Sequence, residues 1–127
     1  MKTPFAGRKA IFLAALFSGV VTARCAGAAT LVSPTVITRF GQDYVACIIV
    51  NADTKDITVN VELLDFEGAL LKQSYIDLAP GRVRDVNLGS VYGGYCRFTG
   101  KFTAKKVRAS ANVIDSEGHN IAIAPAE

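Results

Sequence analysis

The feature that most constrains this chain is a two-residue period of apolar side chains in short segments. Between residues 57 and 64, apolar side chains occupy every second position, and Thr58, Asn60 and Glu62 fall between them. Residues 107–115 repeat this period. Successive side chains of a β-strand point to opposite faces, so the period predicts strands with one buried face. Helical periodicity is almost absent, and an all-β fold is therefore predicted.

Eight segments of this kind predict short antiparallel strands. They are residues 30–38, 44–51, 57–64, 69–78, 82–88, 95–102, 107–115 and 120–124. Pro34 interrupts the first segment, and because proline cannot donate a ladder hydrogen bond, this strand is predicted to lie at an edge or to carry a bulge. Residues 44–51 are almost continuously apolar, as expected of a central strand. Seven or eight strands at this spacing indicate a two-sheet sandwich.

Two turns between these strands share one pattern, with aspartate first and glycine fourth, at residues 65–68 and 115–118. The aspartate side chain accepts hydrogen bonds from the backbone ahead of it, and glycine tolerates positive φ. We therefore predict two hairpin turns of one type. The glycine-rich residues 89–94 are predicted to form a loop.

The first 28 residues have the three parts of a secretory signal peptide. Lys2, Arg8 and Lys9 supply positive charge, residues 10–21 form an apolar run, and residues 26–28 (Ala-Gly-Ala) fit a cleavage site. The apolar run of about twelve residues is shorter than the roughly 20 that a membrane-spanning helix needs. The sequence therefore predicts export to the periplasm or the medium. An uncleaved N-terminal anchor is the alternative.

Cleavage after Ala28 would leave residues 29–127 as one domain without a transmembrane segment. The chain has 14 basic and 11 acidic residues. The leader removes four basic residues and no acidic one, so the mature domain carries a net charge of −1. This charge gives no reason to expect a nucleic-acid partner. Cleavage after Ala23 is the alternative and would retain Cys25, whose preceding Arg24 does not fit a lipid-attachment site.

Cys47 and Cys96 are the cysteines that remain after cleavage at Ala28. An even number of cysteines in an exported chain indicates a disulfide, and two separate buried thiols are the alternative. Closing a loop of about 50 residues stabilises a protein by on the order of 4 kcal/mol in the chain-entropy model. A domain of this size buries a limited fraction of its surface, so such a bridge would matter.

The two cysteines fall in the second and sixth predicted strands, and this layout resembles the immunoglobulin-like sandwich, whose disulfide joins strands B and F across the core. The chain has no tryptophan to pack on the bridge, and Gly94 stands where antibody domains have a tyrosine. The resemblance is therefore to immunoglobulin-like domains of exported bacterial proteins. Residues 45–53, the D-x-x-G turn and the Leu-Ala-Pro-Gly turn are also similar to many small uncharacterised secreted bacterial proteins. The resemblance implies a fold and a location, and no particular activity.

A run of cations is the first candidate site. Arg97, Lys101, Lys105, Lys106 and Arg108 lie within twelve residues that contain no acidic side chain. If the strands on either side of this run form a hairpin, the cations line one side of it and could bind an anionic surface. The alternative, which we favour, is a solvated sheet face whose lysines discourage edge pairing.

The second candidate site is the glycine-rich loop with Tyr92 and the following Tyr95. Glycine and tyrosine together make adaptable binding surfaces, and a tyrosine ring can stack on a sugar. The alternative is a plain strand connection in which Tyr92 covers one end of the core.

No catalytic, metal or cofactor site is predicted. His119 is the only histidine and falls in a polar turn. A catalytic nucleophile would therefore have no neighbouring histidine to act as its base, and a zinc ion would have too few ligands. Asn51, Asp53 and Asp56 could supply calcium ligands, but this composition is typical of ordinary turns.

We therefore expect a non-enzymatic binding or structural module whose partner is another envelope or extracellular protein. A carbohydrate- or polyanion-binding accessory domain is the alternative, using the tyrosine loop or the predicted basic hairpin of residues 97–108. The sequence leaves the ligand and the oligomeric state open.

Overall fold

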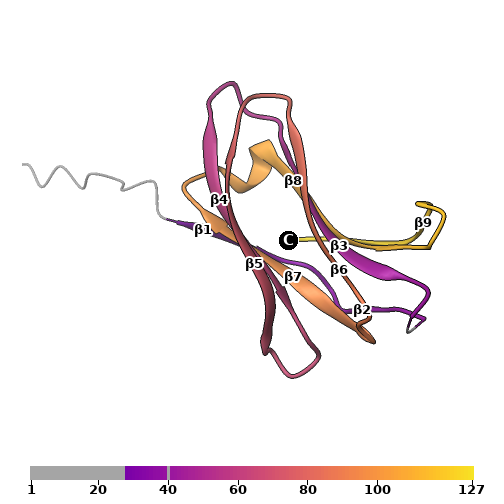
Figure 1. Ribbon diagram of the computed structural model, residues 1–127. Coiled ribbons are helices and arrows are strands. Elements are labelled where there is room, and N and C mark those ends of the chain that lie inside the picture. Colours follow the sequence, from indigo (N-terminus) through magenta and orange to yellow (C-terminus); the bar gives the residue numbers. More distant parts are fainter. Residues whose placement is uncertain (1–27, 40) are drawn as a thin grey trace, which may run out of the picture.

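The computed structural model describes residues 28–39 and 41–127 and folds them into two antiparallel β-sheets packed face to face (Figure 1). In chain order the elements are β1 (Ala29–Val32), β2 (Val36–Ile37), β3 (Tyr44–Asn51), β4 (Ile57–Leu64), β5 (Leu70–Leu78), β6 (Val83–Gly89), β7 (Gly93–Gly100), the short 3-10 helix η1 (Ala104–Lys106), β8 (Val107–Ile114) and β9 (Asn120–Pro125). The predicted all-β, two-sheet sandwich is confirmed. Residues 1–27, with nearly all of the predicted signal peptide and Cys25, lie outside the described part of the chain.

All eight predicted strand segments become strands, and the first one splits in two. Pro34 separates β1 from β2, and both strands pair with β7. In the described part of the chain β1 pairs with no second strand, so its predicted edge position is confirmed. β3 lies between β6 and β8, which confirms the prediction of a central strand.

The five-stranded sheet has the order β1-β7-β4-β5, with β2 also paired to β7, and the four-stranded sheet has the order β6-β3-β8-β9. The inward side chains of both sheets form one buried cluster, because every second residue of each strand points inward. Its members on β3 and β4 are Val45, Cys47, Ile49, Ile57, Val59, Val61 and Leu63. Phe98 on β7 is the largest fully buried side chain of this core. Burial of each such apolar side chain contributes roughly 1.5–3 kcal/mol.

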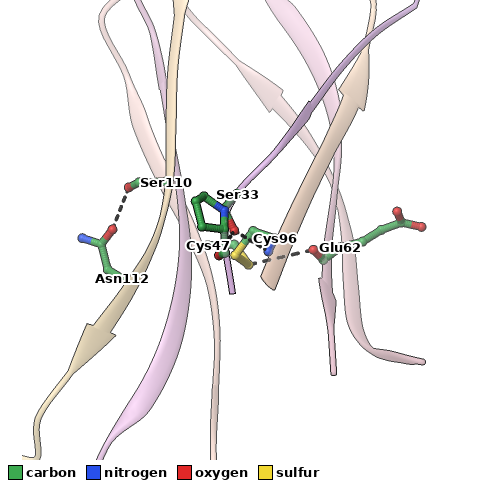
Figure 2. The surroundings of a disulfide bond; sticks show 7 residues. Ser33, Cys47, Glu62, Cys96, Ser110 and Asn112 are labelled. Carbon is green, nitrogen blue, oxygen red and sulfur yellow. Dashed lines mark hydrogen bonds between the residues drawn. A yellow bond between two sulfur atoms is a disulfide. The ribbon is translucent and has the colours of Figure 1, made fainter. Parts of the chain in front are cut away.

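A disulfide joins the two sheets through this core. Cys47 on β3 and Cys96 on β7 form a bond of 2.04 Å between sulfur atoms, and their Cα atoms are 5.6 Å apart. Figure 2 shows that Ser33, in the link between β1 and β2, lies beside the bridge. The backbone N–H of Cys96 donates to Ser33 Oγ at 2.9 Å, and the Ser33 N–H donates to the Cys96 carbonyl oxygen at the same distance. The predicted disulfide is confirmed, and the alternative of two separate thiols is wrong.

The two D-x-x-G turns have the same structure, as predicted. Asp65 Oδ1 accepts hydrogen bonds from the N–H groups two and four residues ahead, and Asp115 Oδ1 accepts the same pair. Gly68 and Gly118 have φ of 83° and 88°, the left-handed region that favours glycine. The side chain of the first residue and the freedom of the fourth therefore determine both hairpins.

The prediction of a loop over residues 89–94 is wrong at both of its ends. Gly89 belongs to β6, while Gly93 and Gly94 are buried in β7, so only residues 90–92 connect the strands. A Cβ at Gly94 would lie 2.1 Å from the Leu64 carbonyl oxygen. Glycine occurs here because the neighbouring backbone approaches closely, and not because a loop needs flexibility.

Candidate functional site

The predicted basic hairpin does not exist. β7 pairs with β1, β2 and β4, whereas β8 pairs with β3 and β9 in the other sheet. Residues 101–106 therefore carry the chain from one sheet to the other. Both hairpins and crossings can have a connection of this length, so the spacing of the strands alone could not distinguish them.

The five cations of that run are consequently spread over the molecule. Arg97 lies on the five-stranded sheet, Lys105 and Lys106 lie in η1, and Arg108 lies on the four-stranded sheet. Arg97 Nε donates to Glu62 Oε2 at 2.5 Å, and this hydrogen bond is the main reason that the pKa of Arg97 lies above its ordinary value.

Two further cations of the run also have partners within the chain. Lys106 Nζ lies 3.6 Å from Asp53 Oδ1, and Arg108 donates to the carbonyl oxygens of Lys105 and Val107. Lys101 is exposed. A surface with its charges divided and partly neutralised in this way is poorly suited to a polyanion.

One end of the sandwich carries an apolar surface that we name the apolar end. Its members are Ile37, Tyr92, Phe66, Leu70 and Leu71, with 76, 67, 53, 51 and 38% of their surfaces exposed. They come from β2, the β6–β7 connection, the β4–β5 turn and the start of β5, which meet at the lower end of the view in Figure 1. Contiguous exposed apolar surface of this kind marks an interaction site more often than scattered single residues do.

The backbone holds these side chains in place. Ile37 on β2 is paired with Gly93 on β7, and the Thr38 N–H donates to the Tyr92 carbonyl oxygen at 3.0 Å. Thr38 Oγ1 also donates to the Val91 carbonyl oxygen. A Cβ at Gly93 would lie 2.8 Å from Cζ of Phe66, so the phenyl ring lies directly on the glycine. The loop that presents Tyr92 is therefore fixed to β2.

A pocket of about 430 Å³ opens between Phe66 and Tyr92. Its lining is completed by Asp65, Glu67, Leu71, Ser90, Val91 and Gly93. The pocket thus combines an apolar floor and two aromatic rings with the carboxylates of the β4–β5 turn. Such a surface suits an apolar side chain from a partner with positive charge nearby.

Of the two tyrosines predicted for binding, only Tyr92 belongs to the apolar end. Tyr95 is half-buried, and its hydroxyl oxygen lies 3.4 Å from the Cβ position of Gly68, which places it against the β4–β5 turn. Tyr92 is 67% exposed. Sequence reasoning missed Phe66, Leu70 and Leu71. The signal was a phenylalanine within a polar turn, followed by two adjacent leucines that break the two-residue period.

Asn51 serves the fold instead of supplying a calcium ligand. Its side chain is fully buried, and Nδ2 donates to the carbonyl oxygens of Lys55 and Leu78 at 2.8 and 2.9 Å. Oδ1 accepts from the Asp53 N–H at 2.9 Å. The amide therefore organises the β3–β4 loop and ties it to β5, and all of this polar capacity is used within the chain.

Replacing Asn51 with alanine is expected to lower the free energy of unfolding by about 2–3 kcal/mol. The change leaves the buried Leu78 carbonyl group without its partner, together with the Lys55 carbonyl group and the Asp53 N–H, whose bonds are partly buried. A buried unsatisfied group costs roughly 1–3 kcal/mol before relaxation. Urea denaturation measures the loss. Asn87→Ala on the exposed side of β6 serves as the matched control, with an expected change within about 0.5 kcal/mol. Equal effects of the two substitutions would show that Asn51 has no organising role.

The β8–β9 turn brings three side chains of metal-ligand type together. Ligand atoms of Asp115, Glu117 and His119 lie within 4.8 Å of one another. Asp115 Oδ1 already accepts two backbone N–H groups, and its Oδ2 lies 3.3 Å from His119 Nδ1. The backbone hydrogen bond from His119 is the main reason that the pKa of Asp115 lies below its ordinary value. The hydrogen bonds of the turn therefore account for this cluster.

Acid is expected to destabilise the domain partly through Asp43. Hydrogen bonds from the Arg39 side chain, at 2.9 and 3.1 Å, hold the pKa of the buried Asp43 carboxyl below its ordinary value. The unfolded state then binds the proton more tightly, so the contribution of this pair is complete above the ordinary pKa of about 3.9 and is lost as the pH falls through the lowered folded value.

The measurement is the urea midpoint between pH 7 and pH 2. Asp43→Asn should have a shallower fall below about pH 4 than the wild type. Arg39→Ala should also show a shallower fall, but a smaller change than Asp43→Asn, because it removes the side-chain donors and keeps the backbone N–H that donates to Asp43 Oδ2. An unchanged slope in both variants would contradict the assignment.

No protein-family model, curated protein or solved structure matches the chain. Within residues 28–39 and 41–127, no helix has both the length and the apolar character needed to cross a membrane. The functional conclusion therefore rests on the surfaces of the domain itself.

Proposed function

We propose that this protein is an exported, non-enzymatic binding module that contacts another envelope or extracellular protein through its apolar end. The observation that carries the proposal is that three exposed apolar side chains from two separate segments, Phe66, Leu71 and Tyr92, line one pocket, with Ile37 on the strand paired beside it. Exposing this much apolar surface gives no benefit to a domain that works alone, because each side chain could be polar without loss to the core.

The chemistry of the apolar end defines the partner. Phe66 and Tyr92 are rigid aromatic groups of the kind that dominate binding energy at protein interfaces. The acidic residues Asp65 and Glu67 line the same pocket. The partner surface therefore presents aliphatic or aromatic side chains with lysine or arginine at their edge.

A non-enzymatic role is supported by what the reactive residues do. Both Cys47 and Cys96 are held in the disulfide. His119, the only histidine of the sequence, is exposed, and in the described part of the chain its ring pairs with two carboxylates of its own turn. A base without a nucleophile gives no covalent or hydrolytic chemistry.

Export and the immunoglobulin-like family belong to the same proposal. The three-part leader and the disulfide support export, since disulfides persist in oxidising compartments. A bridge between β3 and β7, which are the second and the sixth of the predicted strand segments, supports the immunoglobulin-like resemblance. In this chain β1 lies beside β7, the strand that carries Cys96, and β8 lies beside β3, the strand that carries Cys47.

The test is the size of the complex that the protein forms in solubilised envelope from its own host. Wild type is expected to migrate with a partner, and the double variant Phe66→Ser/Tyr92→Ser is expected to migrate alone at its own mass. Val83→Ser/Ile123→Ser is the matched control, because these side chains are 55 and 62% exposed and lie outside the apolar end. A complex that survives the first pair of substitutions, or that only the second pair disrupts, would overturn the proposal.

A further inference from the structure

On the outer face of the five-stranded sheet, polar side chains fill the middle rows of the neighbouring strands β7, β4 and β5. These side chains, which we name the polar face, are Thr58, Asn60 and Glu62 on β4, Gln73, Tyr75 and Asp77 on β5, Arg97 and Thr99 on β7, and Lys101 directly after β7. The register aligns Asn60 with Tyr75 on one side and with Thr99 on the other. Glu62 is aligned in the same way with Gln73 and Arg97.

Hydrogen bonds fix the side chains of this face before any ligand arrives. Gln73 Nε2 donates to Asn60 Oδ1 at 3.0 Å and to the Tyr75 hydroxyl oxygen at 3.2 Å. Thr58 Oγ1 donates to Asp77 Oδ1 at 2.8 Å. A face whose polar groups are already oriented loses less conformational entropy on binding than one that must be ordered.

The charges of the polar face cancel. Arg97 and Lys101 are balanced by Glu62 and Asp77, and the Arg97–Glu62 pair is directly bonded. A polyanion would gain little from such a face, since attraction and repulsion are of similar size. The chemistry that matches it is a neutral polymer with many hydroxyl groups.

Tyr75 gives the polar face an apolar platform. Tyr75 is 75% exposed and lies at the edge-strand end of the row Tyr75–Asn60–Thr99. A hollow of about 500 Å³ lies beside it, lined also by Asp56, Thr58, Gly100 and Lys101. Among the described residues, Asn60 Nδ2 and Gln73 Oε1 take part in no side-chain hydrogen bond, so a donor and an acceptor remain beside the ring.

We propose that the polar face binds a neutral oligosaccharide, with one sugar ring stacked on Tyr75 and its hydroxyl groups bonded to Asn60, Gln73 and Thr99. Sugar rings have apolar C–H faces and polar edges, and an exposed tyrosine surrounded by amides complements both. This site is separate from the apolar end, and it uses neither of the tyrosines that the sequence singled out.

The four-stranded sheet shows that a solvent-facing sheet surface of this protein does not have to be polar throughout. The outward positions of the four-stranded sheet include Ile48, Val50, Val83 and Ile123, which mix with polar residues. The same chain therefore mixes apolar side chains into the outer face of the four-stranded sheet, whereas in the middle rows of β7, β4 and β5 the ring of Tyr75 stands among polar side chains. Leu71 and Tyr95 lie beyond those rows, near the β4–β5 turn.

The experiment uses protein purified after expression and export of the full chain, with its disulfide closed. An array of neutral and anionic glycans is probed first, and calorimetry then measures the affinity for the neutral glycan that binds most tightly. Tyr75→Ala is expected to weaken this binding by at least about tenfold, and Tyr75→Phe to change it by no more than about threefold, because the phenyl ring keeps the stacking surface. Tyr92→Ala, at the apolar end, is expected to leave it unchanged.

Three results would overturn the proposal: no neutral glycan is bound on the array, only anionic glycans such as heparin are bound, or the affinity is the same after Tyr75→Ala. Because Tyr75 is exposed, Tyr75→Ala is not expected to unfold the domain. Equal thermal midpoints of Tyr75→Ala and the wild type show directly that weaker binding is not caused by unfolding. Asn60→Ala gives an independent reading, with an expected loss of about threefold or more and an unchanged thermal midpoint.

Discussion

Replacing both cysteines of the bridge with alanine is expected to lower the free energy of unfolding by about 4 kcal/mol. The bridge closes a loop with a sequence separation of 49 residues, and breaking it releases that loop in the unfolded chain. Domains of this size have only about 5–15 kcal/mol of net stability, so the loss is a large part of the total. Guanidinium denaturation of the variant Cys47→Ala/Cys96→Ala measures it.

The single substitutions make the test sharper. If the cross-link is what stabilises the domain, Cys47→Ala, Cys96→Ala and the double variant should lose similar amounts, because each one removes the same bond. Reduction of the wild type under native conditions should lower its midpoint by a comparable amount. Additive losses in the two single variants, or a loss below about 1 kcal/mol in the double variant, would show that local packing of the two side chains matters more than the link between the sheets.

Gly94→Ala is the substitution with the second-largest expected effect, with a loss of about 3 kcal/mol or more. The new Cβ would lie 2.1 Å from the Leu64 carbonyl oxygen, which is backbone and cannot rotate away. Relief requires β7 and β4 to separate, and this would disturb the ladder next to Cys96 and expose the core between the sheets. Thermal unfolding of the variant, monitored by circular dichroism, measures the effect.

Gly89→Ala is the matched control for this prediction. Gly89 is the last residue of β6, and the nearest atom to a Cβ there is Tyr44 Cβ at 3.9 Å, an ordinary contact. Its replacement should change the stability by less than about 0.5 kcal/mol. The two glycines lie within one glycine-rich stretch, so similar effects of the two substitutions would mean that the stretch behaves as a uniform flexible loop.

The sequence predicts well what depends on neighbours along the chain. The period of residues 57–64 predicted both the bounds and the buried side of β4, and Pro34 predicted the break in the first strand. Asp65 and Asp115 predicted their turns because the partner groups lie two and four residues ahead. The pairing of the cysteines followed from their number and from the predicted export.

Features that depend on which strands become neighbours were beyond this reasoning. The crossing of residues 101–106 between the sheets is decided by the pairing of β8 with β3, which lies far earlier in the chain. The glycines at 93 and 94 are explained only once β7 lies between β2 and β4. The outward-facing residues of β4 and of β7 could each be predicted from the sequence. That they form one polar face follows only from the register between the two strands.

The residues of the candidate site also divide into those that the sequence indicates and those that only the fold brings together. Tyr92 was singled out from its glycine-rich surroundings, whereas Phe66 and Leu71 carried only the weak signal of apolar residues in and after a polar turn, and Ile37 carried none. These residues meet because β2 pairs with the start of β7 and because the β4–β5 turn ends at the same side of the sandwich. An apolar surface assembled from three distant segments is recognisable only in the folded chain.

The measurement that tests the central claim most directly is site-specific photo-crosslinking in the native envelope. A benzophenone side chain replaces Tyr92 in one variant and Ile123, an exposed residue of β9, in another. If the apolar end is the contact surface, position 92 gives a discrete cross-linked product that disappears when Phe66→Ser is added. Position 123 then gives no such product. Cross-linking from position 123 alone, or a product from position 92 that Phe66→Ser leaves unchanged, would contradict this account of how the domain makes contact.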